Sequence, residues 1–261
     1  MSLDGSDRLG VMLAAEKRAT RTVRATWLGR IAYVEAVALQ REAERRVAAG
    51  GEESFLLLEH EPVFTLGRNA SAADVLLPPD RCRDLGIEVQ ESNRGGKVTY
   101  HGPGQLVGYP IVNLSPDRRD VKRYVTDLEE VLIRTLADFG VSAARSPVRE
   151  RMTSVWVGNE KIAAIGVHLA RWITTHGFAM NVTDEPLALF RGIVPCGITD
   201  GGVTSIERVT GKRVAPEVLA PSVLRHFAEV FGREIIQGDA TRVIPRNAAT
   251  RNLPGLGPPR E

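Results

Sequence analysis

Residues 154–182, SVWVGNEKIAAIGVHLARWITTHGFAMNV, decide the fold class of this chain. They contain three apolar segments, 154–157, 162–172 and 178–182, and the pair Gly158-Asn159 that joins the first two is typical of tight turns. Strands that follow one another through short connections pair as antiparallel neighbours, because a parallel crossover needs about a dozen residues or more. The stretch therefore predicts an antiparallel meander.

Strands and helices interleave in the rest of the chain. The apolar pattern predicts a helix over 120–139, and Gly140 ends it. Further helices are expected at 31–49 and 221–231, and further strands at 22–28, 55–58, 63–66 and 87–91. Since the middle strands connect by hairpins and not by helices, the sequence predicts an α/β fold class of the α+β type, with a mixed sheet.

The stretch 94–114, RGGKVTYHGPGQLVGYPIVNL, mixes glycines with β-forming residues. We interpret its glycines as the turns of a β-hairpin, whose bare backbone would let a long thin ligand lie against it. It is not a phosphate-binding loop, because it lacks the GxxxxGK[ST] spacing and no GxGxxG turn joins a strand to a helix.

The composition is that of one globular domain: 261 residues, a net charge of +2 and 43% hydrophobic residues. We expect a flexible arm over 1–20, one domain over 21–237 and a disordered tail over 238–261, where four prolines occur without periodicity. The near-neutral charge gives no support for nucleic-acid binding, and no apolar stretch is long enough for a membrane span. Two distant cysteines and no recognisable export signal indicate a cytoplasmic protein with reduced thiols.

Two residues could carry nucleophilic chemistry. Cys196, between Pro195 and Gly197, would place its thiol on a tight loop beside free backbone N–H groups, although residue type alone favours a small buried side chain next to a turn. A thiol needs a base or a cation to become a thiolate near neutral pH. Lys161 enters an apolar strand after a turn. It could act as the base or as the cation, or it could be a solvated turn lysine.

The histidines leave two alternatives open. His101 and His176 each lie beside a glycine, and each could be a base or a hydrogen-bonded structural imidazole. Together with His168 and Cys196 they carry metal-binding atoms, but no pair shows the short spacing of a zinc site. We therefore expect no metal.

Five blocks of this chain together resemble the lipoyl(octanoyl) transferases of protein lipoylation. The blocks are EHEPVFTLGR (59–68), NRGGKVTYHGPGQLVGYPIVNL (93–114), VWVGNEKIAAIGVHL (155–169), THGFAMNV (175–182) and IVPCGI (193–198). The resemblance implies the single-domain fold of the biotin/lipoate protein ligases. It also implies transfer of an octanoyl group from acyl carrier protein to a lysine of a lipoyl domain, in a 2-oxoacid dehydrogenase complex or in the H protein of glycine cleavage.

The same resemblance assigns roles to residues. It puts the nucleophile on Cys196 and the catalytic lysine on Lys161, and it expects the octanoyl chain near Tyr100, Ile165 and Phe178. The substrate-binding positions are Arg94, Gly95, Gly96, Lys97, Val98, Thr99, Tyr100, His101, Ala164, Ile165, Gly166, Gly177, Phe178 and Ala179. Lys97 departs from the family, which usually has glutamine there, so the acyl preference could differ if this side chain lines the pocket.

A thioester donor already carries the activation for amide formation, so the implied reaction needs no cofactor and no ATP. A monomer is expected. The rival interpretations are an ATP-dependent lipoate or biotin ligase of the same fold, in which the cysteine–lysine pair would have no task, and a non-catalytic domain that holds acyl or lipoyl groups. The basic cluster Arg118, Arg119, Lys122 and Arg123 is either a docking patch for the acidic carrier protein or a solvated helix end.

Overall fold

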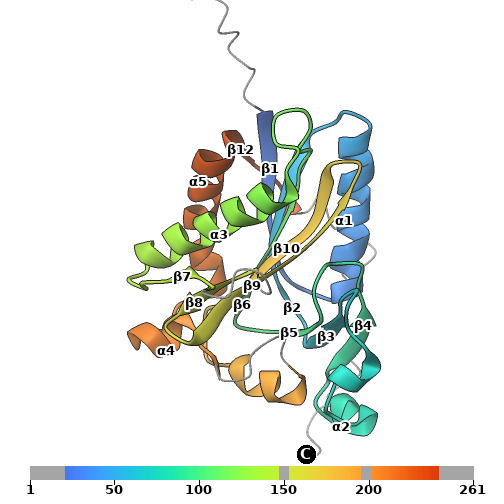
Figure 1. The fold of residues 1–261 in the computed structure, drawn as a ribbon, viewed down its shortest axis with the longest axis vertical. Coiled ribbons are helices and arrows are strands. Elements are labelled where there is room, and N and C mark those ends of the chain that lie inside the picture. Colours follow the sequence, from blue (N-terminus) through green and yellow to red (C-terminus); the bar gives the residue numbers. More distant parts are fainter. Residues whose placement is uncertain (1–20, 147–152, 195–201, 241–261) are drawn as a thin grey trace, which may run out of the picture.

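The computed structural model describes residues 21–146, 153–194 and 202–240, which form two sheets covered by helices (Figure 1). The larger sheet has nine strands among these residues, in the order β12-β1-β2-β6-β10-β9-β8-β7, with β11 beside β9. Its strands are β1 (Arg21–Ile31), β2 (Glu53–His60), β6 (Gln105–Ile111), β7 (Ala144–Arg145), β8 (Ser154–Val157), β9 (Glu160–Ala170), β10 (Ile173–Asn181), β11 (Gly202–Val203) and β12 (Arg233–Gln237). The smaller sheet has the order β4 (Glu88–Glu91), β3 (Val63–Leu66) and β5 (Val98–His101).

The larger sheet is mixed, which confirms the predicted fold class. β8, β9 and β10 form the expected antiparallel meander, and β10 continues the antiparallel pairing to β6. β1 instead runs parallel to both β2 and β12. The helix α1 (Tyr33–Ala48) follows β1 and provides the crossover that a parallel β1–β2 pair needs.

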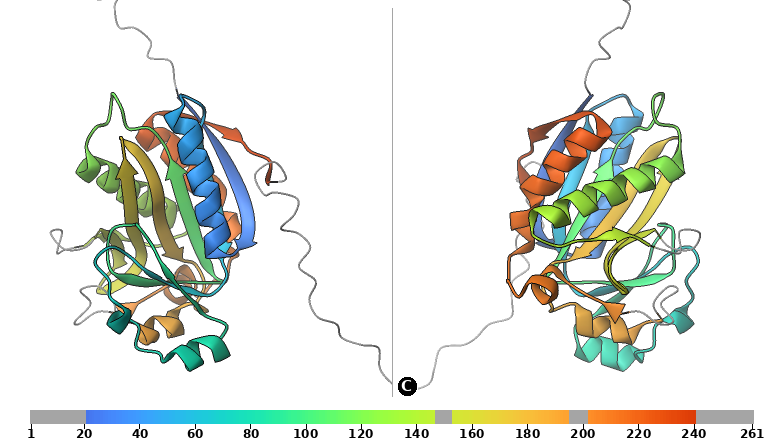
Figure 2. Two further views of the ribbon diagram at one scale, coloured as in Figure 1. Left: turned by 90° about the vertical axis from the view of Figure 1, so that its right-hand side faces the viewer. Right: turned by 60° about the vertical axis from the view of Figure 1, so that its left-hand side comes forward.

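Helices cover both faces of the larger sheet. α1 lies on one face, and α3 (Val121–Asp138) lies with α5 (Ala220–Phe231) on the other (Figure 2). The alternation of β2 explains this arrangement, because Phe55 and Leu57 pack in the cluster of α3 and α5 while Leu56 and Leu58 pack in that of α1. The remaining helical turns are η1 (Ala72–Asp74), α2 (Pro79–Asp84), η2 (Leu187–Gly192), α4 (Ile206–Thr210) and η3 (Pro216–Leu219).

The glycine-rich stretch corrects one prediction, because β5 and β6 do not form a hairpin. β5 pairs with β3 in the smaller sheet, whereas β6 pairs with β2 and β10 in the larger one. The chain passes between the sheets at Gly102-Pro103-Gly104. A Cβ on Gly102 would overlap the Tyr100 side chain, and Gly104 has a φ of +87°, so glycine is required at both positions by close packing and by backbone conformation.

The sequence did not predict α2 or β12. The expected arm over 1–20 lies outside the described residues, and so does the expected tail from 241 onward. The first residues of that tail are placed: the Gly238 N–H donates to the Ala25 carbonyl at 2.6 Å, and Ala240 packs against the α1 cluster. Among the described residues, no helix is both long enough and apolar enough to cross a membrane.

Candidate active site

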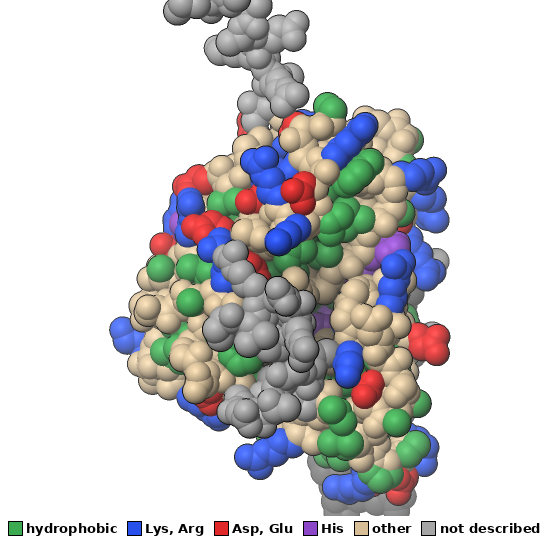
Figure 3. Space-filling view, in the orientation of Figure 1, with side chains coloured by type: hydrophobic (Ala, Val, Ile, Leu, Met, Phe, Trp, Pro, Cys, Tyr) green, Lys and Arg blue, Asp and Glu red, His purple; other side chains and the backbone are tan. Residues whose placement is uncertain are grey.

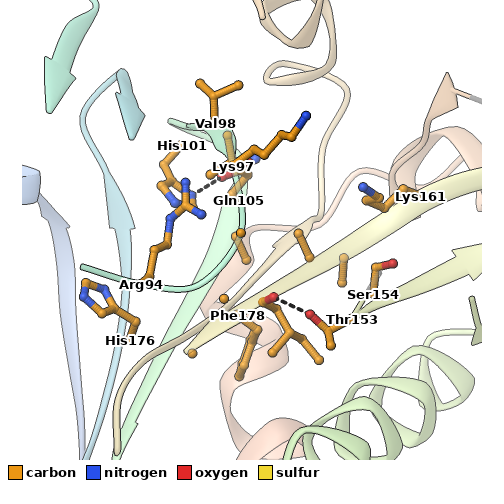
Figure 4. A pocket seen from close by; sticks show the side chains of 18 of the residues that line it. Arg94, Lys97, Val98, His101, Gln105, Thr153, Ser154, Lys161, His176 and Phe178 are labelled. Atoms are coloured by element: carbon orange, nitrogen blue, oxygen red, sulfur yellow. Dashed lines mark hydrogen bonds between the residues drawn. The ribbon is translucent and has the colours of Figure 1, made fainter. Parts of the chain in front are cut away.

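A cavity of about 400 Å³ lies between the two sheets (Figure 4). Its walls come from the loop before β5, from β5 itself and from the facing parts of β9 and β10. The sequence-predicted residues that line it are Arg94, Gly95, Gly96, Lys97, Val98, Thr99, His101, Lys161, Ala164, Ile165, Gly166, Gly177, Phe178 and Ala179. The cavity thus brings together the segments 94–101 and 161–166, which lie sixty or more positions apart in the sequence.

Tyr100 does not line the cavity. Its ring is buried under the smaller sheet, 5.7 Å from the ring of Phe64 and 6.0 Å from that of Phe190. Successive residues of a strand point to opposite faces, so Thr99 and His101 face the cavity where Tyr100 does not. Of the three residues expected beside the octanoyl chain, the structure therefore places Ile165 and Phe178 in the wall, with Tyr100 behind it.

Glycines allow the strands of this wall to approach closely. Gly166 of β9 pairs with Gly177 of β10, and a Cβ on Gly177 would overlap the carbonyl oxygen of Gly108 on β6. The loop 94–97 rests on the same place, since the Gly95 N–H donates to the Val167 carbonyl at 2.9 Å. The bare backbone predicted from the glycines is thus used for packing between strands and loop as well as for lining the cavity.

Arg94 fixes the loop in front of β5. Its guanidinium is buried and donates to the Thr65 carbonyl at 2.6 Å, to the Thr65 hydroxyl at 2.8 Å and to the Gly95 carbonyl at 3.0 Å. Thr65 belongs to β3, so the side chain ties the loop to the smaller sheet. Arg94 is therefore a residue that shapes the cavity wall and places a positive charge in it.

Three buried histidines are in their neutral form, and two of them, His101 and His176, feel this charge. Burial lowers the pKa of His60 to about 4, and burial followed by the charge of Arg94 lowers the pKa of His176 to about 3. Burial also holds the pKa of His101 well below its ordinary value, and the neighbouring His60 and Arg94 add to the effect. A general base works best when its pKa is near the working pH, so these pKa values argue against His101 and His176 as bases.

A hydrogen-bond chain joins His101 to the backbone of Lys161. His101 Nδ1 donates to Gln105 Oε1 at 3.2 Å, and Gln105 Nε2 donates to Asn181 Oδ1 at 3.0 Å. Asn181 Nδ2 donates to the Thr204 carbonyl at 3.0 Å, and the Thr204 N–H donates to the Lys161 carbonyl at 3.0 Å. The chain fixes the tautomer of His101, because Gln105 Oε1 can only accept.

The sequence reasoning missed Gln105 and Asn181. Each is a polar residue at the end of a buried strand, and a buried amide needs hydrogen-bond partners. That pattern could have identified them. The other lining residues that were not predicted to bind substrate are Tyr33, Asn69, Tyr109, Thr153, Ser154, Ile162, Ala163, His176, Phe190, Ile193 and Val203.

Lys161 lies in the cavity wall near the start of β9. Its side chain is half-buried, and Nζ lies 5.4 Å from the centre of the Trp156 ring, within cation–π range. Cys196 belongs to residues 195–201, which lie outside the described residues. Ile193 before that segment and Val203 after it both line the cavity, and Val203 pairs with Lys161 across β11 and β9.

The basic cluster at the start of α3 lies away from the cavity. It follows the Ile111 end of β6, whereas Gln105 at the other end of that strand lines the cavity. Arg118 is engaged within the protein: it forms an ion pair with Asp127 and donates to the Val230 carbonyl at 3.0 Å. Arg119, Lys122 and Arg123 are exposed. The structure therefore offers little support for a docking patch that serves this cavity.

The neutral histidines predict that the free energy of unfolding falls as the pH drops from 7 towards 5. An unfolded histidine takes up a proton near pH 6.5, whereas folded His60 does so only near its lowered pKa of about 4. Between these values the unfolded chain binds more protons, so acid favours unfolding. Urea unfolding at pH 7 and pH 5 measures the change. His60→Gln removes this titration, and an equal loss of stability in both proteins would contradict the assignment.

Comparisons of the sequence with known proteins identify the family, and comparisons of the structure identify the fold. Residues 32–228 match the family described as the lipoyl protein ligase A/B catalytic domain. An octanoyltransferase of Solibacter usitatus is 48% identical over 212 residues, which cover 81% of this chain and 94% of that protein. A lipoate-protein ligase A bound with ATP has a TM-score of 0.70 at 16% identity, over 85% of this chain and 90% of its own.

A second solved structure has the same fold. The bipartite lipoate protein ligase of Thermoplasma acidophilum, described together with its E2 lipoyl domain, has a TM-score of 0.67 at 17% identity and covers 85% of this chain and 89% of its own. At such identities the two structures establish the fold alone. The expected biotin/lipoate ligase type of fold is thereby confirmed.

Proposed function

The chain belongs to the lipoyl protein ligase A/B catalytic-domain family, and we propose that it transfers an octanoyl group from acyl carrier protein to a lysine of a lipoyl domain through a thioester on Cys196. The octanoyltransferase of Solibacter usitatus supports the acyl transfer, since 94% of that protein aligns with this chain. The proposal goes further in three respects: the thioester on Cys196, the carrier protein as donor and the lipoyl domain as acceptor.

The observation that carries the proposal is that Lys161 shares a cavity with residues on both sides of the segment that contains Cys196. Ile193 and Val203 line the same cavity as Lys161. Cys196 lies three positions after Ile193 in the sequence. This closeness in the sequence to a residue of the cavity wall supports our proposal that the thiol acts with the Lys161 amine on a substrate in the cavity.

The chemistry of the first half-reaction follows from these two groups. Lys161 accepts the proton of the Cys196 thiol, and the thiolate attacks the carbonyl carbon of the octanoyl thioester. The bond between that carbon and the carrier's sulfur breaks, and the departing thiolate takes the proton back from Lys161. Exchange of one thioester for another changes the free energy little, so the acyl-enzyme can form without another source of energy.

The second half-reaction uses the same groups in reverse. The amine of the acceptor lysine attacks the acyl carbon, and the bond from that carbon to Cys196 breaks. Lys161 accepts the proton that the amine loses and passes it to the departing Cys196 thiolate, which restores the thiol. The product is an amide, which is more stable than the thioester, so the overall transfer runs downhill.

The cavity can hold the acyl chain. Its volume of about 400 Å³ is in the range of small-molecule sites, and Ile162, Ile165 and Phe178 give it an apolar wall. Lys97 is exposed and lines the cavity, so its side chain is one of the groups that a bound acyl chain or its thioester would meet. The departure from glutamine at this position therefore concerns the pocket itself.

The main alternative is an ATP-dependent ligase, because lipoate protein ligases share this fold. The two activities differ in what they require: a ligase must activate a free acid with ATP, whereas a thioester donor is already activated. Octanoyl transfer from octanoyl–acyl carrier protein to an apo lipoyl domain should therefore continue after apyrase has removed all nucleotide. Turnover that stops under this treatment would favour the ligase. A protein that retains the acyl group without passing it on would favour the non-catalytic alternative.

The acceptors that we propose are lipoyl domains of 2-oxoacid dehydrogenase complexes and the H protein of glycine cleavage. The ligase of Thermoplasma acidophilum, which has the same fold, is described together with an E2 lipoyl domain, and this supports a lipoyl domain as the acceptor. A cytoplasmic reaction carried out by a monomer remains the expectation.

A further inference from the structure

The rim of the cavity carries cations that the fold does not neutralise. Most arginines elsewhere in the described part of the chain lie in ion pairs, as Arg24 does with Glu52 and Arg233 with Glu53. Within that same part of the chain, no carboxylate forms an ion pair with Arg68 or Lys97, and both side chains are exposed. Figure 3 shows blue basic side chains beside a purple histidine to the right of the central hollow.

Backbone hydrogen bonds hold Arg68 at this rim. The Arg68 N–H donates to the Arg94 carbonyl at 3.1 Å, and the Asn69 N–H donates to the Gly96 carbonyl at 3.1 Å. The segment after β3 is thus paired with the loop 94–97 that forms the cavity wall, and Asn69 itself lines the cavity. These bonds therefore place Arg68 directly beside Asn69 of the cavity wall.

His168 of β9 completes a set of donors with Arg68. Arg68 Nη2 lies 3.0 Å from His168 Nδ1, and since a guanidinium only donates, Nδ1 is the acceptor. His168 is then the tautomer with its proton on Nε2, a state that burial and the charge of Arg68 favour by lowering its pKa, while Glu44 opposes them. One N–H of His168 and the other N–H groups of Arg68 are left to bind an anion.

We propose that Arg68 and His168 bind the phosphate at the base of the donor's phosphopantetheine arm. This inference rests on the proposed function, since it names a subsite for the octanoyl donor of that reaction. A guanidinium beside a neutral imidazole N–H is well suited to phosphate oxygens, which accept several charge-assisted hydrogen bonds at once.

The spacing along β9 fits a long arm. Lys161 and His168 lie seven positions apart on this strand, which corresponds to about 23 Å at about 3.3 Å per residue. The side chains of Lys161 and Arg68 shorten the gap that the arm itself must bridge. A donor that enters along β9 would thus place its thioester near Lys161 and its phosphate at the rim.

The test compares two small donors that differ only in the phosphate, octanoyl-pantetheine and octanoyl-4′-phosphopantetheine. In the wild-type protein, kcat/KM for acyl-enzyme formation should be about tenfold higher with the phosphorylated donor. This is the effect expected when the phosphate forms charge-assisted hydrogen bonds with the protein. Arg68→Met should bring this ratio close to one, and Arg68→Lys should keep part of it. Higher salt should reduce the wild-type preference, because the site is exposed.

Arg83→Met is the matched control, because Arg83 is an exposed arginine of α2 that does not line the cavity. This variant should keep the wild-type ratio. Binding of acyl-free 4′-phosphopantetheine, followed by calorimetry, should weaken about tenfold in Arg68→Met and not in Arg83→Met.

Two outcomes separate the subsite from the proposed function. Equal kcat/KM values for both donors in the wild type, or an unchanged ratio in Arg68→Met, would overturn the phosphate subsite while acyl transfer stands. A protein that accepts octanoyl from neither small donor nor from the carrier protein would overturn the proposed function and the donor named with it.

Discussion

Mixing the wild-type protein with octanoyl–acyl carrier protein, without any acceptor, should add one octanoyl group, whereas Cys196→Ala should gain none. The expected effect is a complete loss, because an alanine side chain has no atom that could form the thioester. Intact-mass measurement detects the added group. Treatment with hydroxylamine should then remove it, since hydroxylamine cleaves thioesters readily and amides poorly.

Cys82 provides the control for this experiment. Its thiol is buried under the smaller sheet, where burial raises its pKa, and it donates a weak hydrogen bond to the Leu77 carbonyl at 3.8 Å. A thiol with a raised pKa and little access forms hardly any thiolate near neutral pH. Cys82→Ala should therefore acquire the octanoyl group like the wild type. Acylation that persists in Cys196→Ala would show that another residue is the nucleophile.

Replacing Lys161 by alanine should slow both half-reactions, by about 100- to 10,000-fold, the range in which general acid–base catalysis operates. Lys161→Arg keeps the positive charge, but a guanidinium stays protonated and cannot act as a base. It should preserve part of acyl-enzyme formation and still block transfer to the acceptor amine. Single-turnover rates of acylation and of transfer, measured separately, test this difference.

Lys212 provides a control for the Lys161 variants. It is an exposed lysine that follows α4 and does not line the cavity, so Lys212→Ala should keep both rates. A near wild-type rate in Lys161→Ala would contradict the proposed mechanism. The ligase interpretation would then become the better one, since it gives this lysine no part in a thioester step.

Local sequence patterns predicted most of the regular elements. The helix expected over 120–139 occurs as α3 (Val121–Asp138), and the strand at 63–66 occurs as β3 with the same bounds. These predictions succeed because apolar periodicity and glycine stops act within one segment. β12 was missed, because a short strand at the edge of a sheet depends on its partner β1 and carries only a weak pattern of its own.

The error at 94–114 has a physical cause. Two neighbouring β-segments joined by a glycine-rich turn usually pair with each other, and nothing in the local sequence says that they will not. Here each strand pairs with strands that are distant in the sequence. β5 pairs with β3, and β6 pairs with β2 and β10. Strand pairing over such distances is decided by which faces can be buried together. The same choice of faces turns Tyr100 into the core of the smaller sheet.

The sequence by itself determined the fold class, the family resemblance and the candidate pair Cys196 and Lys161, because these depend on local periodicity and on residue types at fixed spacing. Only the tertiary structure decided which residues share the cavity wall and how they are held. Arg94 on Thr65, His101 linked through Gln105 and Asn181, and Arg68 on His168 are contacts between distant segments. Their geometry follows from how the two sheets pack, since hydrogen bonds and charges act over a few ångströms in space whatever the separation along the chain.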